Sequence, residues 1–301
     1  MQLNLFDSDS ERDRADSVVN VASVPQRSPF RYPGGKTWLV PRIRQWLRSI
    51  SPKSPHLVEL FAGGAIAGLT TAAEQLADQV TLVELDDAVA AVWKTILQDA
   101  EGDEWLARQI DQFEMSLPAV NALLLKTPCS VRDLAFQTIV RNRVNRGGIL
   151  APGAGLIKAG ENGRGLTSRW YPATLQNRIR AIVQDRDRLT FVHGDGLQML
   201  AGKHWPDDTV FFIDPPYSAA KTSAGSRLYT HFDLDHARLF AELAALPNDF
   251  LMTYDDTPQV RALAGQSGFS VAAVAMKNTH HARKTELLIG RRLGWLSAPD
   301  R

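Results

Sequence analysis

The stretch Leu57–Ala77 reads LVELFAGGAIAGLTTAAEQLA, an apolar run that leads into two glycines and then into small residues. Leu57–Phe61 has the length and composition of a short buried strand. Gly63-Gly64 interrupts the apolar run, because glycine is the residue that a tight turn accepts most easily. Ala65–Ala77 then predicts a helix. The stretch is therefore a strand, a glycine turn and a helix in sequence.

The same order repeats along the chain. Val80–Val83 is a second apolar strand that ends at Glu84, and a helical pattern follows over Asp87–Gln98. Strands that alternate with helices of this length predict an α/β protein with a parallel sheet. Five later strands are expected at Leu189–His193, Thr209–Ile213, Asp249–Thr253, Val271–Ala275 and Thr285–Gly290.

The alternation divides the chain into regions. Residues 1–27 are polar and acidic and are expected to form a disordered tail. Residues 28–100 and 187–301 carry the strands and form the expected catalytic domain, which opens with a helical pattern from Lys36 to about Arg48. Residues 101–186 are predicted to be a helical insertion that contains a glycine-rich loop.

Composition excludes several classes of protein. The 301 residues are 44% hydrophobic and 22% charged, which are ordinary values for a globular protein. No run approaches the roughly 18 apolar residues of a membrane span, and no secretory signal is expected at the polar N-terminus. Cys129 is the single cysteine, which excludes an internal disulfide and a cysteine-based zinc site. A cytoplasmic protein is predicted.

Positive charge is concentrated in the insertion. Residues 132–190 hold ten arginines and one lysine against four acidic residues, a net charge of +7 in a chain whose total is +1. A cationic segment on an acidic body suggests a surface that binds a polyanion. A solvated arginine-rich helix surface explains the charge equally well.

The strongest chemical signal is Asp214-Pro215-Pro216-Tyr217, directly after the apolar strand Val210–Ile213. An exocyclic amino nitrogen is a poor nucleophile, because its lone pair is delocalised into the ring. The Asp214 carboxylate and the Pro215 carbonyl can accept hydrogen bonds from its two N–H groups, and the prolines hold the turn rigid. Tyr217 offers a face for stacking a base. The alternative is a proline-rich turn capped by Asp214.

Other candidates surround an expected ligand pocket. Glu59 and Phe61 lead into Gly63-Gly64, where glycine lets a ligand approach the backbone closely. Glu84 ends the second strand, at a spacing where an acid can hold a ribose. Lys36 follows two glycines at a helix start and could meet an anion such as a methionine carboxylate. Asp195 could contact an adenine amino group. Glu84 and Asp195 could instead be ordinary residues of helix N-termini.

These motifs resemble those of the Dam-type (D12 class) DNA adenine-N6 methyltransferases. The order PGGK, FAGGA, an acid after the second strand, and DPPY is that of the family over about residues 28–290, although FAGGA departs from the family's FxGxG. The resemblance implies a Rossmann-like seven-stranded sheet with an antiparallel last strand, S-adenosylmethionine as methyl donor, and a target adenine flipped out of double-stranded DNA. No metal is implied. The resemblance also implies roles for single residues. Tyr32, Gly34 and Lys36 fall in the N-terminal cofactor motif, and Phe61, Gly63 and Gly64 fall in the glycine motif. Glu84 matches the acid that binds the ribose, Asp195 matches the residue that contacts the adenine, and Asp214 to Tyr217 match the catalytic tetrapeptide.

The resemblance also covers DNA contacts. The segment Arg141–Gly147 is similar to a DNA-contacting stretch of the family, and Arg283–Leu288 to its late basic segment. Arginine pairs with phosphate or guanine, and asparagine with adenine. The candidate DNA-binding residues are Arg141, Arg143, Asn145, Arg146, Arg164, Arg169 and Lys284. Trp170 could be a wedge or a core residue.

The N-terminal residues Gln2-Leu3-Asn4-Leu5-Phe6 lie outside the family pattern and resemble the peptide by which bacterial proteins dock into the sliding clamp. Leu5 and Phe6 could enter an apolar pocket while Gln2 forms a hydrogen bond nearby, and Leu3 belongs to the same partner-binding peptide. The alternative is a functionless tail.

Rival functions share the same motifs. The tetrapeptide suits any exocyclic amine, so methylation of cytosine N4 in DNA or of adenine N6 in RNA stays open. A DNA-binding module without catalysis is a rival of another class.

Overall fold

The computed structural model describes residues 23–31, 35–50, 52–202, 204–216, 233–277 and 283–297. Several predicted residues lie outside this set and stay predictions: Gln2, Leu3, Leu5, Phe6, Tyr32, Gly34, Tyr217 and the side chain of Lys284.

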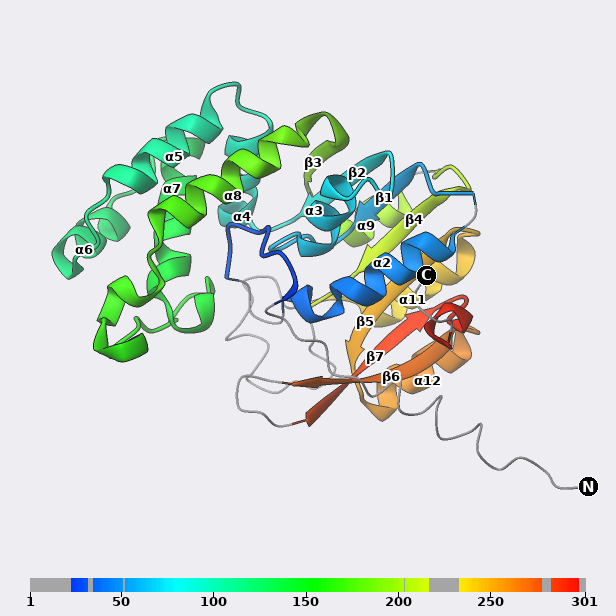
Figure 1. The fold of residues 1–301 in the computed structure, drawn as a ribbon. Coiled ribbons are helices and arrows are strands. Elements are labelled where there is room, and N and C mark those ends of the chain that lie inside the picture. Colours follow the sequence, from blue (N-terminus) through cyan, green and yellow to red (C-terminus); the bar gives the residue numbers. More distant parts are fainter. Residues whose placement is uncertain are drawn as a thin grey trace, which may run out of the picture.

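Seven strands form one sheet in the order β3-β2-β1-β4-β5-β7-β6 (Figure 1). The pairs β1–β2, β2–β3, β1–β4 and β4–β5 are parallel, and β7 is antiparallel to both β5 and β6. The predicted class is therefore confirmed as α/β, with a Rossmann-like seven-stranded sheet whose last strand is antiparallel. The strands are β1 (His56–Glu59), β2 (Gln79–Glu84), β3 (Leu189–His193), β4 (Thr209–Ile213), β5 (Asp249–Asp255), β6 (Ser270–Lys277) and β7 (Arg283–Gly290).

The strand order reverses beside β1. The chain moves outward from β1 to β2 and β3, and then returns to β4 on the other side of β1. The connections that leave the carboxyl ends of β1 and β4 therefore run in opposite directions. Such a reversal opens a crevice at the carboxyl edge, where α/β sheets bind ligands.

Helices cover both faces of the sheet, because the side chains of a buried strand alternate between two apolar surroundings. Leu57 and Phe212 point into a core shared with α2, α3 and α4, here named the α4 side. Val58 and Phe211 point into a core shared with α9, α11 and α12, the α11 side. No helix in the described residues is both long and apolar enough to cross a membrane. The bounds are α2 (Val40–Ser49), α3 (Ile66–Ala73), α4 (Asp87–Leu97), α9 (Gly196–Ala201), α11 (His236–Ala245) and α12 (Pro258–Gln266).

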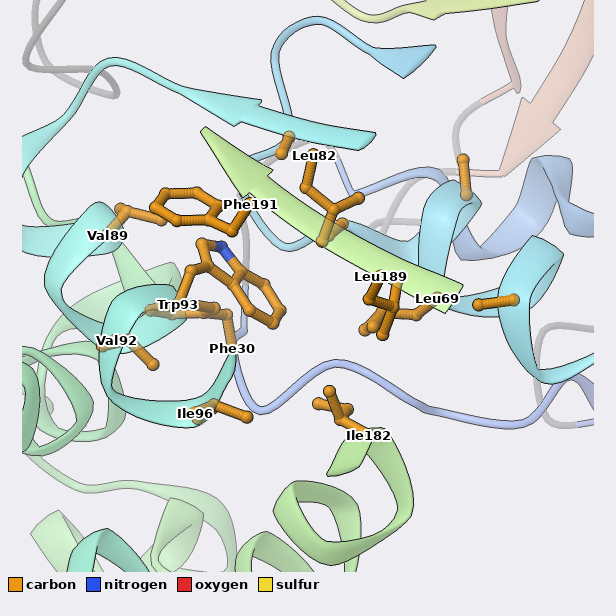
Figure 2. Close-up of a cluster of buried hydrophobic side chains, with 14 of the residues drawn as sticks. Phe30, Leu69, Leu82, Val89, Val92, Trp93, Ile96, Ile182, Leu189 and Phe191 are labelled. Atoms are coloured by element: carbon orange, nitrogen blue, oxygen red, sulfur yellow. The ribbon is translucent and has the colours of Figure 1, made fainter. Parts of the chain in front are cut away.

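Trp93 lies at the centre of the α4 side (Figure 2). Its ring packs against Phe30, with 5.7 Å between the ring centroids. Phe191 of β3 and Ile182 of the insertion belong to the same cluster. One continuous core therefore joins the sheet, the segment before α2 and the insertion.

The insertion forms a group of helices beside α4 (Figure 1). Trp170 is buried and packs edge-on against Phe113 at 5.8 Å, so it is a core residue. The helices are α5 (Gly102–Gln112), α6 (Leu117–Leu125), α7 (Val131–Val144) and α8 (Pro172–Gln184). Short 3-10 turns are η2 (Lys36–Leu39), η3 (Arg146–Gly148), η4 (Glu161–Gly163), η5 (Gly165–Arg169), η6 (Arg186–Arg188) and η7 (Gly294–Ser297).

Candidate functional site

A cavity of about 460 Å³ lies at the reversal point of the sheet. Its wall takes residues from the carboxyl ends of β1, β2, β3 and β4, from the segment before η2 and from the insertion. Many of the residues predicted from the sequence line it: Lys36, Glu59, Phe61, Gly63, Gly64, Glu84, Asp195, Asp214 and Pro216, together with Arg143 and Arg169.

The turn after β1 is held in a conformation that favours glycine. Gly63 has φ +48°, and Ala65 has φ +53° just before α3. The backbone N–H of Gly63 donates to Glu84 Oε2 at 2.7 Å, and its carbonyl accepts from Trp93 Nε1 at 3.0 Å. The turn is thus fixed from both sides and presents its backbone to the cavity.

Glu84 ends β2 with its side chain buried against this turn. Its Oε1 accepts from the backbone N–H of Asp86 at 2.8 Å. Asp86, not Glu84, caps α4, since its carboxylate accepts from Ala88 and Val89. Burial raises the pKa of Glu84 to about 7. Asp86 is thus the N-cap of α4, and Glu84 supports the segment that leads into it.

Glu59 is a second buried acid of the wall. Its Oε2 accepts from the backbone N–H of Gly68 in α3 at 2.7 Å. Burial raises its pKa to about 8, and the neighbouring charge of Asp214 acts in the same direction. Glu59 therefore ties β1 to α3 below the cavity.

Asp195 caps α9 by accepting from the backbone N–H groups of Leu197 and Gln198, and it also lines the cavity. The N-cap interpretation of Asp195 is confirmed, and its contact with an adenine amino group stays a prediction. Gly196, which was not singled out, lies so close to Leu60 that a Cβ would meet the Leu60 carbonyl oxygen. The start of α9 can approach the backbone at Leu60 this closely because residue 196 has no Cβ.

Asp214 follows β4 directly, with its side chain 23% exposed. Its Oδ1 lies 2.9 Å from Lys36 Nζ and accepts from Thr253 Oγ1 at 2.7 Å. Pro215 is buried and Pro216 lines the cavity. The carboxylate thus sits at the cavity wall in a fixed orientation.

Lys36 makes two ion pairs that the sequence did not predict. Its ammonium lies between two carboxylates, Asp214 at 2.9 Å and Glu286 at 3.0 Å. Burial alone lowers the pKa of Lys36, but the two carboxylates outweigh burial and raise it. The two carboxylates balance the charge of Lys36 and tie its ammonium to Asp214, and its predicted contact with a ligand anion stays a prediction. Sequence reasoning missed Glu286 and Thr253.

The predicted DNA-binding residues separate into buried and exposed groups. Arg143 and Asn145 are each 5% exposed, and they donate to the carbonyls of Pro29 and Ile149. The sequence did not predict this burial, which backbone hydrogen bonds maintain, and contact of either residue with DNA stays a prediction. Arg146 and Arg164 are exposed, and Arg141 and Arg169 are half-buried.

Four arginines, Arg31, Arg143, Arg169 and Arg178, line the insertion side of the cavity. Burial lowers the pKa of Arg143 to about 9, and the charges of the other three add to this effect. Arg31 and Arg178 were not predicted from the sequence. The cavity therefore has an acidic wall at the strand ends and a basic wall opposite.

Part of the positive charge of the insertion is balanced within the protein. Arg132 pairs with Asp99 at 2.6 Å, Arg180 with Glu104 at 3.1 Å and Arg186 with Asp103 at 3.3 Å. These three arginines satisfy the solvated-helix interpretation of the charge, whereas Arg146 and Arg164 are open to solvent.

Comparisons with known proteins give no family assignment. No protein-family model matches the chain, and no curated protein matches it either. Among solved structures, a provisionally assigned RNA methyltransferase from Pyrococcus horikoshii has 10% identity and a TM-score of 0.41, covering 94% of this chain and 97% of its own. An rRNA methyltransferase from Streptomyces viridochromogenes has 15% identity and a TM-score of 0.38, covering 93% and 92%. A precorrin-6y C5,15-methyltransferase from Geobacter metallireducens has 7% identity and a TM-score of 0.34, covering 84% and 86%. These values are too low to support an inference about activity or substrate, which is argued below from the site itself.

Proposed function

We propose that this protein transfers a methyl group from S-adenosylmethionine to the exocyclic N6 of adenine in DNA. One observation carries the proposal: Asp214, followed by Pro215, comes directly after β4 at the same cavity as the Gly63-Gly64 turn and Glu84. An acceptor for an amino group and a receptor for a nucleoside donor therefore share one wall.

The strand-end wall suits a donor with a nucleoside and a positive sulfur. A cavity of about 460 Å³ falls within the range of small-molecule sites. Glu84 can accept hydrogen bonds from ribose hydroxyls, and the backbone at Gly63 and Gly64 allows close approach. Asp214 and the ionised form of Glu84 place negative charge at the cavity, which favours a cationic ligand. S-adenosylmethionine, when bound, supplies an electrophilic methyl group.

Asp214 and Pro215 act on the nitrogen that receives the methyl group. The Asp214 carboxylate accepts one N–H and the Pro215 carbonyl accepts the other, which turns the lone pair out of conjugation. As the N–C bond would form, the S–CH3 bond of the donor would break and leave a neutral thioether. The nitrogen would become cationic, and the adjacent carboxylate would stabilise that charge. The proton leaves afterwards to solvent, so Asp214 need not be a strong base.

DNA is proposed as the substrate because of the family resemblance and the basic wall. Arg143 is buried, and its Nε has no hydrogen-bond partner among the described residues. An oxyanion that enters with a nucleotide would offset the charge of this wall. A base inside a duplex cannot reach a recessed carboxylate, so the adenine is expected to flip out of the stack.

The proposal is tested by methyl transfer from a tritiated donor to duplex DNA, followed by digestion to nucleosides and mass spectrometry. We expect N6-methyladenine, and we expect Asp214→Ala to abolish transfer while donor binding and the melting temperature persist. Asp207→Asn is the matched control, because Asp207 is exposed just before the opposite end of β4.

Other products decide between the alternatives. N4-methylcytosine, or N6-methyladenine formed only in RNA, would transfer the proposal to that substrate. Binding of duplex DNA with no transfer to any nucleic acid would identify a DNA-binding module. Full activity of Asp214→Ala would reject the role of its carboxylate.

A further inference from the structure

Glu286 has no role in the chemistry described so far, yet it is a buried carboxylate in contact with Lys36. Its side chain is 4% exposed, and its Oε1 lies 3.0 Å from Lys36 Nζ. The same ammonium lies 2.9 Å from Asp214 Oδ1. Burying charges is costly unless each is paired with good geometry, so the arrangement of one ammonium between two carboxylates calls for an explanation.

The strand order explains why these groups meet. β4, β5 and β7 are neighbours in the sheet, and Asp214, Thr253 and Glu286 belong to these three strands or follow them directly. Side chains two residues apart along a strand share a face. Each of the three lies two residues from a side chain of the α4 side: Phe212, Leu251 and Leu288. Lys36, at the start of η2, reaches them from the same side.

Two donors from different elements bind the same oxygen of Asp214. Lys36 Nζ and Thr253 Oγ1 both contact Oδ1. The terminal torsion of an aspartate is broad, so a single contact would leave the carboxylate plane poorly defined. Two donors on Oδ1 restrict that plane, which sets the direction in which Oδ2 can accept a hydrogen bond from an amine.

We propose that Glu286 is a positioning residue for methyl transfer: it anchors the Lys36 ammonium on β7, so that Lys36 holds Asp214 in the orientation that receives the target amine. This inference rests on the proposed function. With Asp214 as its sole carboxylate, the flexible lysine would follow any rotation of that side chain. Glu286 gives the ammonium a second, rigid attachment. Sharing the ammonium also leaves more negative charge on Asp214 for the nitrogen that becomes cationic.

The test compares Glu286→Gln, which keeps the shape and one acceptor oxygen, with Glu286→Asp, which keeps the charge. We expect Glu286→Gln to lower kcat by about 10- to 100-fold, the size of effect that misplacing a reacting group causes. KM for the donor and the melting temperature should stay near their wild-type values. Glu286→Asp should recover part of the lost kcat. Glu114→Gln, an exposed acid of the insertion, is the charge-matched control.

A double-mutant cycle asks whether Glu286 acts through Lys36. Once Lys36→Met has removed the ammonium, adding Glu286→Gln should lower kcat no further, because coupled residues are non-additive. The double variant buries no unpaired charge at these two positions, so it stays measurable if Lys36→Met alone unfolds. In that case the kcat of the Lys36→Met, Glu286→Gln double variant is compared with that of the Lys36→Met, Glu286→Leu double variant, and the two values should be equal.

The outcomes separate the two claims. An active wild type whose kcat is unchanged in Glu286→Gln, or equal losses in the Gln and Asp variants, would overturn the positioning role. A wild type that methylates no nucleic acid refutes the proposed function instead. In that case the side-chain carboxyl 13C resonance of Asp214 tests whether Glu286 acts on Asp214 through Lys36. A shift of this resonance in Glu286→Gln supports that connection, and an unchanged resonance overturns it.

Discussion

Glu84 Oε2 accepts a hydrogen bond from the backbone N–H of Gly63 at 2.7 Å, so the acid that ends β2 also fixes the turn that follows β1. We predict that Glu84→Ala weakens binding of S-adenosylmethionine by about 10- to 100-fold, because hydrogen bonds to a charged group are worth roughly 1.5–3 kcal/mol. Titration calorimetry measures the affinity. Glu84→Gln should lose less, since its amide oxygen can still accept from Gly63.

The control for this prediction is Asp87→Asn. Asp87 begins α4 with an 86% exposed side chain and does not line the cavity. Equal weakening in Asp87→Asn and Glu84→Ala would mean that general negative charge, and not the contact at Glu84, governs donor binding.

Gly68 is predicted to be intolerant of a side chain. A Cβ at this position of α3 would lie 2.7 Å from Glu59 Oε2 and against the side chain of Leu82. We expect Gly68→Ala to lower the free energy of unfolding by about 1–3 kcal/mol, the usual cost of overpacking. Gly265→Ala in α12 is the matched control, because a Cβ there meets nothing within 4 Å. It should stabilise by about 0.5–1 kcal/mol. Denaturant unfolding of both variants checks the pair, and equal effects would contradict the packing argument.

Glu59 should make the protein less stable as pH rises. Burial raises its pKa from 4.5 to about 8, so between these values the folded state holds a proton that the unfolded state has lost. The free energy of unfolding must then fall as pH increases through this window. Glu59→Gln removes the titrating group and keeps an acceptor for Gly68, so it should gain stability relative to wild type from pH 5 to pH 8. A difference between the two proteins that does not vary with pH would show that Glu59 is ionised when folded.

Arg146 and Arg164 are predicted to contact DNA phosphates, because both are exposed on the insertion. Each substitution to Gln should weaken duplex binding and reduce the slope of log affinity against log salt by about 0.9, the value for one phosphate contact. Arg180→Gln is the control, since Arg180 already pairs with Glu104 at 3.1 Å. Fluorescence anisotropy at several salt concentrations gives the slopes. Losses as large in Arg180→Gln would indicate only a diffuse effect of charge.

The strands were predictable because the signal for a buried strand is local. Leu189–His193 and Thr209–Ile213 were predicted with the bounds that the structure has, and the other strands differ at their ends. Helix ends were less accurate: the helix expected over Ala65–Ala77 ends at Ala73. A helix can end where its tertiary contacts end, and those contacts are not visible in a short window of sequence.

The sequence also identified the cavity residues that follow strands, such as Glu84 and Asp214, because parallel strands bring their carboxyl ends to one edge. It did not predict the partners of Lys36, Arg143 and Asn145. Their residue types suggested contacts with a ligand or DNA, whereas in the structure they pair with Glu286 and with the carbonyls of Pro29 and Ile149. Glu286 and Pro29 are distant in sequence from Lys36 and Arg143, so a local pattern does not reveal these pairs. A period-two count along β7 would have placed Glu286 on the α4 side.

By itself, then, the sequence determined the strands, the glycine turn and the acids at the strand ends, since each depends on neighbouring residues along the chain. Only the tertiary structure decided how the charges pair. The Lys36 ammonium meets Asp214 and Glu286 because β4 and β7 both flank β5 in the sheet. Charge pairing depends on distance through space, and residues 36, 214 and 286 become neighbours only when the sheet has formed.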